Sequence, residues 1–244
     1  MFMVNGEVSI VAMAPQALAR AQELALSLAL PLLGRPADVA GMVLEVYPDR
    51  LALRNSAQPG THALVIDPQH RRRPAPGRDL IARSLGRGCR SIIDATAGFG
   101  TDAFDFARRG KKVTAIERVG VIAAMLEDAA QRFRFECANA QFVVVAGDAC
   151  EQIALQQPAD VIFLDPMFPQ TQRHTALARK SQQLLRVLAG DDRDAQQLVN
   201  IARENALRRV VVKRPRHAVP LAANPDSCFK GRSIRYDVYL AGAS

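Results

Sequence analysis

The 244-residue chain predicts an α/β fold in which helices cover a mostly parallel sheet. Three observations support this prediction. Beyond about residue 79, short runs of β-branched and aromatic residues alternate with segments of helical pattern. The apolar share of 49% is enough for a substantial core. Such alternation places helices on both faces of a parallel sheet through right-handed crossovers.

Residues 1–78 have a different texture and predict a small α+β subdomain. An alanine- and leucine-rich helix is expected from Pro15 to about Leu30. Pro-Asp and Gln-Pro-Gly turn signals separate three strand-like runs, which favours an antiparallel hairpin. These runs are MVLEVY (42–47), RLALR (50–54) and HALVID (62–67). The Arg-, Pro- and Gly-rich residues 70–78 are expected to connect this subdomain to the main domain.

The main domain, residues 79–244, is expected to alternate strands and helices throughout. The strand-like runs are SIIDA (91–95), KVTAIE (112–117), QFVVVA (141–146), DVIFLD (160–165), RRVVVKR (208–214) and SIRYDVYLA (233–241). The expected helices span about 102–109, 120–135, 174–189 and 194–206. In this architecture ligands bind beyond the carboxyl ends of the strands. The residues at those ends are therefore the candidates for chemistry.

Composition excludes several classes of protein. No run of about 18 uncharged apolar residues indicates a membrane span, and the N-terminus lacks the basic start of a secretory signal. The four cysteines include no Cys-x-x-Cys pair, so neither a zinc site nor a disulfide framework is expected. The four scattered histidines do not suggest a metal site either. A cytoplasmic protein without a metal is the prediction.

The net charge of +8 is concentrated in two clusters. Arg71, Arg72 and Arg73 begin an arginine-rich stretch that reaches residue 90, and Lys213, Arg214 and Arg216 form the second cluster. Each cluster has two interpretations. It is either a solvated surface or a polyanion site, in which cations displace counterions from a phosphate backbone. Charge alone does not choose between them.

The turn after the first strand of the main domain has a glycine-rich sequence between two acidic residues, Asp94 and Asp102. Gly98 and Gly100 allow the backbone to approach a ligand closely, and Thr101 or Asp102 can cap the following helix. The full Gly-x-Gly-x-x-Gly dinucleotide fingerprint is absent. Acidic residues at both ends are unfavourable for a pyrophosphate. The turn therefore suits a cationic ligand better.

Carboxylates recur at the ends of the later strands. Glu117 ends the second strand, where it can accept hydrogen bonds from both hydroxyls of a ribose. Asp148 follows the third strand, where it can accept from an adenine amino group, and Asp165 ends the fourth. A ligand with a sulfonium, an ammonium, a ribose diol and an adenine fits this set. We therefore predict S-adenosylmethionine as cofactor and S-adenosylhomocysteine as product, although each carboxylate by itself is also compatible with a helix cap or strand terminator.

The fourth strand ends in Asp165-Pro166-Met167-Phe168, which resembles the Asp/Asn-Pro-Pro-aromatic signature of amino-methyltransferases. An exocyclic base nitrogen is a poor nucleophile because its lone pair is delocalised into the ring. Hydrogen bonds from that nitrogen to Asp165 and to the carbonyl of Pro166 would direct the lone pair at the methyl group. Phe168 would stack on a base swung out of its helix or loop. Met167 departs from the general signature, which has a second proline there.

Several motifs together resemble the ribosomal RNA small subunit methyltransferase J family. They are DATAGFGTDAF (94–104), the pair Glu117-Arg118, LDPMFP (164–169), RVVVKRP (209–215) and RYDVYLA (235–241). The resemblance implies a Rossmann-like class I methyltransferase with a seven-stranded sheet. It also implies methyl transfer from S-adenosylmethionine to N2 of one guanosine near the 3′ end of 16S rRNA. The implied cofactor contacts are Thr101, Asp102, Glu117, Arg118, Asp148, Ala149 and Asp165, and Met167 becomes a feature of the family.

The same resemblance makes 16S rRNA or the small ribosomal subunit the expected partner. Lys213 and Arg214 end the strand that follows Asp165, so both are expected to contact phosphate or to support the target base. Two alternatives stay open. One is an amino-group methyltransferase acting on DNA or on a protein amide, and the other is a non-catalytic RNA-binding protein with this fold. An NAD-dependent oxidoreductase is disfavoured by the missing third glycine and by the acidic first turn.

Overall fold

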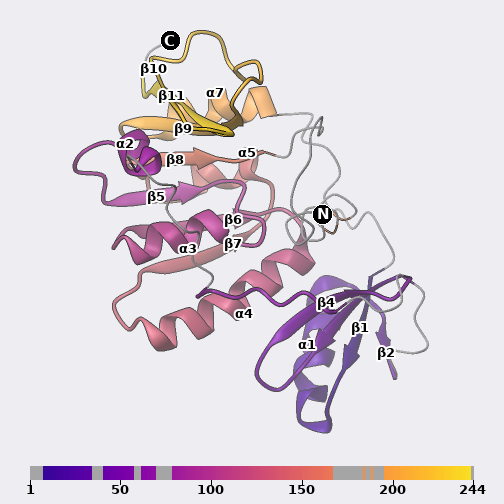
Figure 1. The fold of residues 1–244 in the computed structure, drawn as a ribbon. Coiled ribbons are helices and arrows are strands. Elements are labelled where there is room, and N and C mark those ends of the chain that lie inside the picture. The colour runs from indigo at the N-terminus through magenta and orange to yellow at the C-terminus, as the bar shows by residue number, and fades with distance from the viewer. Residues whose placement is uncertain are drawn as a thin grey trace.

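The computed structural model describes residues 8–34, 41–57, 62–69, 79–166, 184, 188 and 195–242. Two sheets organise these residues, one of four strands near the N-terminus and one of seven strands (Figure 1). The predicted α/β class and the mostly parallel seven-stranded sheet are confirmed. We retain the division into residues 1–78 and 79–244 as a proposal, because the connector at 70–78 lies outside the described residues.

The smaller sheet has the strand order β2-β1-β3-β4. Its strands are β1 (Val8–Ala12), β2 (Leu32–Leu33), β3 (Met42–Val46) and β4 (Leu51–Asn55). The predicted antiparallel hairpin is confirmed, because β3 and β4 pair from Met42↔Asn55 to Val46↔Leu51. The predicted first helix begins as a short 3-10 turn, η1 (Pro15–Ala17), and continues as α1 (Leu18–Leu28).

Two features of this sheet differ from the prediction. The run HALVID (62–67) is not a strand, since only Leu64 makes a single bridge to Leu53 on β4. In contrast, β1 is a strand that the sequence analysis did not identify, and it pairs in parallel with both β2 and β3. Its central position explains why it is buried, with Ile10 and Val11 fully inaccessible.

The larger sheet has the strand order β10-β11-β9-β8-β5-β6-β7. Its strands are β5 (Ser91–Asp94), β6 (Lys112–Glu117), β7 (Phe142–Ala146), β8 (Val161–Leu164), β9 (Arg209–Pro215), β10 (Ser227–Lys230) and β11 (Ile234–Leu240). All pairs among β5 to β9 are parallel, whereas β11 runs antiparallel to β9 and to β10. Consequently the β10–β11 turn lies at the same end of the sheet as the carboxyl ends of β5, β6, β8 and β9.

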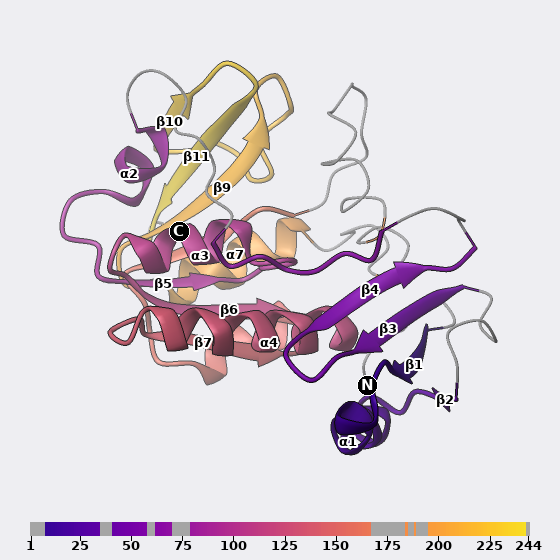
Figure 2. The same cartoon turned by 60° about the horizontal axis from the view of Figure 1, so that its bottom comes forward.

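Helices cover both faces of this sheet, as predicted. They are α2 (Leu80–Leu85), α3 (Thr101–Arg108), α4 (Gly120–Glu136), α5 (Ala149–Gln152) with the 3-10 turn η3 (Ile153–Leu155), and α7 (Ala195–Asn205). The successive strand residues Ile92 and Ile93 point to opposite faces. Ile92 belongs to the core under α2, α3 and α4, and Ile93 to the core under α5 and α7. Figure 2 shows α3 and α4 on one face of the sheet and α7 on the other. Of the predicted helix 174–189, only positions 184 and 188 are described, and both are helical.

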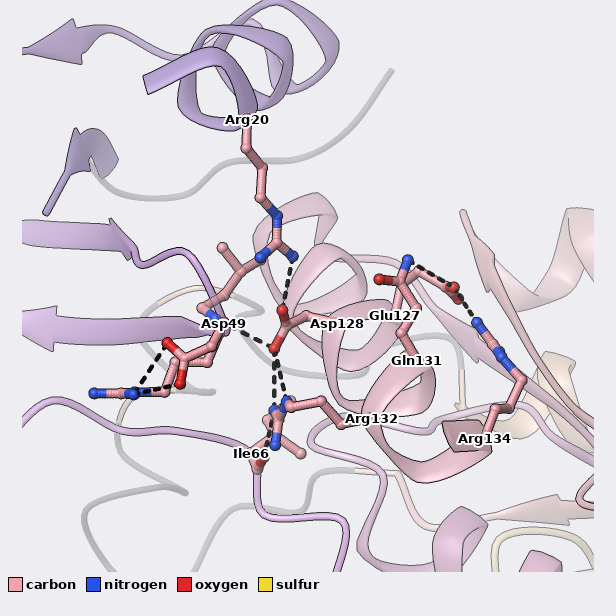
Figure 3. A network of polar contacts seen from close by, with 10 residues as sticks. Arg20, Asp49, Ile66, Glu127, Asp128, Gln131, Arg132 and Arg134 are labelled. Atoms are coloured by element: carbon pink, nitrogen blue, oxygen red, sulfur yellow. Dashed lines mark hydrogen bonds and ion pairs between the residues drawn. The ribbon is translucent and has the colours of Figure 1, made fainter. Parts of the chain in front are cut away.

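The small sheet packs against the main domain through Asp128, a buried residue of α4 (Figure 3). Its carboxylate accepts hydrogen bonds from Arg20 Nη2 of α1 at 2.7 Å and from the Leu51 N–H of β4 at 3.2 Å. Arg132, one turn along α4, donates to the same carboxylate at 3.0 Å and to the Ile66 carbonyl at 2.9 Å. The Asp128 carboxylate thus joins α1 and β4 to α4, and Arg132 adds the segment at Ile66.

Candidate functional site

The predicted acidic residues come together at the carboxyl end of the seven-stranded sheet. Asp94 ends β5, Glu117 ends β6, and Asp165 follows β8 directly. The strand β5 lies between β6 and β8 in the sheet. Because neighbouring strands are about 4.8 Å apart, all three carboxylates lie within reach of one nucleoside-sized ligand.

Glycines shape the turn that leads from β5 to α3. Gly98 and Gly100 both have left-handed backbone conformations, with φ of 53° and 75°. A Cβ atom on Gly100 would lie 2.5 Å from Leu126 Cδ1 and 2.8 Å from Phe104 Cε2, so a larger residue would displace these side chains and strain the left-handed backbone. Gly100 is also the residue that precedes the helix, and Thr101 is already its first residue. The prediction that Thr101 or Asp102 caps this helix is therefore wrong, because the tight turn needs glycine at the cap and places both side chains within the first helical turn.

The carboxylate of Glu117 accepts hydrogen bonds from the turns that follow β5 and β6. Its Oε2 accepts a hydrogen bond from the Gly98 N–H at 2.8 Å, and its Oε1 accepts one from the Val119 N–H at 2.7 Å. The residue is buried, at 7% exposure. Each carboxylate oxygen has a second lone pair, so these bonds orient the group and leave it able to accept from a ribose hydroxyl. Arg118 follows it and is half-buried.

Asp148 acts as a helix cap in the structure. Its Oδ1 accepts a hydrogen bond from the Cys150 N–H at 2.8 Å, which begins α5. Ala149 is buried as the first residue of that helix. The preceding Gly147 donates its N–H to the Glu117 carbonyl at 2.9 Å, which holds the ends of β6 and β7 side by side. The cap was one of the two interpretations of Asp148 from the sequence, and its contact to adenine stays a prediction.

Lys213 of β9 bridges two of the predicted carboxylates. Its ammonium Nζ lies 2.6 Å from Asp102 Oδ2 and 2.5 Å from Asp165 Oδ2. The lysine is buried, whereas the Asp165 side chain is 38% exposed. The backbone N–H of Asp165 donates to Thr96 Oγ1 at 2.7 Å. Thr96 was not identified from the sequence, and only its place in the turn after β5 would have indicated it.

The group formed by Asp94, Asp102, Asp165 and Lys213 contains more acidic than basic side chains. Burial raises the pKa of Asp94 well above its ordinary value, and the nearby carboxylates of Asp102 and Asp165 raise it further. A hydrogen bond from the Thr96 N–H and the charge of Lys213 oppose that shift. Three carboxyl groups thus face one ammonium, which favours a ligand that brings positive charge.

The second basic cluster is less exposed than its sequence suggested. Lys213 and Arg214 are buried, at 6% and 7% exposure, and only Arg216 is exposed. Arg214 donates to the Val219 carbonyl and Arg216 to the Gly231 carbonyl. An exposed phosphate contact is therefore not the role that this geometry supports for Lys213 or Arg214. Their positions on a central strand, with helices on both faces, turn them inward.

Several predicted site residues cannot be placed. Arg71, Arg72, Arg73, Met167 and Phe168 lie outside the described residues, whereas Pro166 is described and buried.

Within the described ranges, no group of three or more His, Cys, Asp or Glu side chains could hold a metal ion. No helix in the same part of the chain is long and apolar enough to cross a membrane.

Exposed cations that the sequence analysis did not assign lie at the same end of the sheet. Lys230 ends β10, Arg232 lies in the β10–β11 turn, and both are exposed. The Arg216 N–H donates to the Ser233 carbonyl at 2.9 Å, so this turn sits directly beside the end of β9. The sequence signal, Lys-Gly-Arg before the last strand, had no assigned place because β10 was not predicted.

Comparison with known proteins places these features in a family. A family model described as "Putative SAM-dependent methyltransferase" matches residues 27–241. A protein named Ribosomal RNA small subunit methyltransferase J from Coxiella burnetii is 36% identical over 252 residues, covering 97% of this chain and 98% of that protein. A protein of the same name from Chromohalobacter salexigens is 39% identical, covering 82% and 86%. The crystal structure of a SAM-dependent methyltransferase from Neisseria gonorrhoeae has a TM-score of 0.76 at 29% identity, covering 97% of both chains.

Proposed function

The chain belongs to the ribosomal RNA small subunit methyltransferase J family, and from this premise we propose that it methylates N2 of a guanosine near the 3′ end of 16S rRNA. As a member of this family it is a transferase that uses S-adenosylmethionine. The observation that carries the proposal is the cluster of carboxylates at the strand ends, with Asp165 half exposed at its outer side. A cytoplasmic location is part of the same proposal.

The residues at the strand ends fit S-adenosylmethionine by their chemistry. The carboxyl groups of Asp94, Asp102 and Asp165 outnumber the one ammonium among them, which suits a ligand with a sulfonium and an ammonium. The proposed cofactor-binding residues are Asp94, Gly98, Thr101, Asp102, Glu117, Arg118, Asp148, Ala149 and Asp165. When bound, the cofactor supplies an electrophilic methyl group on its sulfonium.

Asp165 and Pro166 are the proposed catalytic residues of the described chain. The carboxylate of Asp165 would accept a hydrogen bond from the exocyclic amino group, and the carbonyl of Pro166 would accept a second. Two such bonds turn the nitrogen lone pair toward the methyl group, so that the rate gain comes from alignment and electrostatics. Phe168, outside the described residues, is proposed to stack on the target base.

Exposed cations beside the site would bind the phosphates that flank this base. Arg216, Lys230 and Arg232 lie one to three strands from Asp165, which corresponds to about 5–14 Å. That span covers a few nucleotides of backbone on one side of a base held at Asp165. We propose these three residues as the RNA-binding surface of the described chain, together with Arg71, Arg72 and Arg73 from outside it.

The direct test is to incubate the protein with unmethylated small ribosomal subunits and methyl-labelled S-adenosylmethionine, and then to map the labelled nucleotide. We expect one labelled guanosine near the 3′ end of 16S rRNA. Label on another nucleotide would refute the proposed target. Label on DNA or on a protein amide would favour the first alternative. Binding of S-adenosylhomocysteine without any transfer would favour a non-catalytic RNA-binding protein.

A variant experiment tests the role of Asp165. Asp165→Ala should abolish turnover while the circular dichroism spectrum and the binding of S-adenosylhomocysteine remain measurable. Asp105→Ala is the matched control, because Asp105 is a part-exposed carboxylate on α3 that pairs with Arg109. Turnover of Asp165→Ala at the level of that control would rule out the assigned role.

A further inference from the structure

Lys213 is a buried cation that holds together two carboxylates of the proposed site. The register of the sheet places it there. Leu164 of β8 pairs with Val212 of β9, so the next residues, Asp165 directly after β8 and Lys213 within β9, lie side by side. From the other direction α3 brings Asp102 to the same ammonium, at 2.6 Å. The contact therefore joins α3, β8 and β9 at one point.

The physical cost of this arrangement indicates a specific role. Burying an ammonium or a carboxylate is unfavourable unless each is paired and hydrogen-bonded. Lys213 is 7% exposed at its side chain and Asp102 is 9% exposed, so both are largely removed from water. Asp165 is the exception, at 38% exposure. The ammonium therefore contacts one carboxylate that is enclosed and one that faces the solvent side, where a substrate amine would arrive.

We propose that Lys213 is a positioning residue for methyl transfer, which orients and keeps ionised the Asp165 carboxylate that accepts the substrate amine. This inference rests on the proposed function. By binding Oδ2 of Asp165 at 2.5 Å, the ammonium fixes the rotation of the carboxylate about its side-chain bonds. It also offsets the repulsion that the buried carboxylate of Asp102, from α3, exerts on a negative charge at Asp165. The carboxyl group of Asp94, from β5, is the third acidic group beside them. On the remaining side β11 places Tyr236 in register with Lys213.

Two other roles for Lys213 make different predictions. A phosphate contact requires an accessible ammonium, and its loss would weaken RNA binding and reduce the dependence of that binding on salt. A purely structural ion pair would affect stability, and replacing both partners by neutral groups would then restore the protein fully. A positioning residue instead lowers the rate of the bound complex, and restored stability does not restore that rate.

The experiment compares three variants of the full chain. Lys213→Met keeps the length of the side chain without its charge, and Lys213→Arg keeps the charge. The double variant Asp102→Asn/Lys213→Met removes the buried negative charge together with its cation, which guards against loss of folding. Each variant is measured for its thermal midpoint and its affinity for S-adenosylhomocysteine. The salt dependence of rRNA binding is also measured, together with kcat and KM at saturating S-adenosylmethionine.

We expect Lys213→Met to lower kcat by about 100-fold, the scale seen when an oriented polar group of an active site is lost or displaced. The KM for rRNA and the salt dependence should stay at the wild-type values, and Lys213→Arg should recover part of kcat. The double variant should recover the thermal midpoint but not kcat. In Lys213→Met the acidic limb of the kcat profile should move to higher pH, because the remaining carboxyl groups hold a proton more tightly without the cation.

Four outcomes would overturn parts of this scheme. A higher KM for rRNA with a smaller salt dependence and unchanged kcat would make Lys213 a phosphate contact. Recovery of kcat together with stability in the double variant would make it a structural residue only. A wild-type protein that methylates no small-subunit RNA would refute the proposed function and this inference with it, whereas an active wild type with an equally active Lys213→Met refutes the inference alone.

Discussion

The contact of Asp128 with the N-terminal part predicts a measurable loss of stability when its carboxylate is removed. In Asp128→Ala, three donors lose their acceptor: Arg20, Arg132 and the backbone N–H of Leu51 (Figure 3). The two arginine side chains are 33% and 30% exposed and can turn to water. Leu51 is 1% exposed, so its N–H is enclosed and cannot turn to water as the arginine side chains can.

The magnitude follows from these three losses. A buried donor without a partner costs about 1–3 kcal/mol, and each part-exposed ion pair contributes about 0.5 kcal/mol. Asp128→Ala should therefore lower the free energy of unfolding by about 2–4 kcal/mol. For a chain of this size that corresponds to a decrease of roughly 4–16 °C in the thermal midpoint. Asp128→Asn should lose less, because its amide oxygen still accepts from Leu51.

Urea denaturation of the three proteins, with equal slopes, measures these differences. Asp49→Ala is the matched control, because Asp49 is 69% exposed and its ion pair with Arg50 lies at the surface. The control should stay within about 0.5 kcal/mol of the wild type. The reasoning is refuted if Asp128→Ala is as stable as Asp49→Ala. If Asp128→Asn is as unstable as Asp128→Ala, the hydrogen bond from the Leu51 N–H is not the main contribution to the lost stability.

Three further predictions concern the site. Glu117→Gln should weaken the binding of S-adenosylhomocysteine by about 10-fold or more in calorimetry, as the loss of a charge-assisted bond predicts; an unchanged affinity would argue against the ribose contact. Arg232→Ala should reduce the salt slope of rRNA binding by about 0.7. The control is Lys112→Ala, which changes an exposed cation at the opposite end of the sheet and should leave the slope unchanged. Equal slopes for the two variants would show that Arg232 is not part of the RNA-binding surface. Burial and the charge of Asp102 raise the pKa of Asp94 in the folded protein. As pH rises, the Asp94 carboxyl group therefore loses its proton at a lower pH in the unfolded state than in the folded state. The wild type consequently loses stability as pH rises above about 4 toward the raised pKa. Asp94→Asn should gain stability relative to the wild type over that range, and a difference independent of pH would contradict the burial argument.

Local patterns predicted the elements whose apolar or helical pattern is regular. The strands around SIIDA, KVTAIE and VIFLD, and the helices that follow the first two, lie within one or two residues of their expected positions. Period-two and helical patterns are properties of the chain itself, so they survive folding. The strand β10 was not predicted, and the run HALVID was wrongly predicted as a strand, because strand formation there depends on an available partner.

The sequence by itself determined which residues stand at the strand ends. A parallel sheet brings all carboxyl ends to one side, so Asp94, Glu117 and Asp165 could be predicted to meet without knowing the strand order. Only the tertiary structure decided where the ammonium of Lys213 lies. Its basic sequence context predicted a phosphate contact or support of the target base. In the structure β9 lies beside β8, and the ammonium points inward to Asp102 of α3 and to Asp165. Side-chain direction on a central strand depends on register and on the layers that cover it, and neither is written in the local sequence.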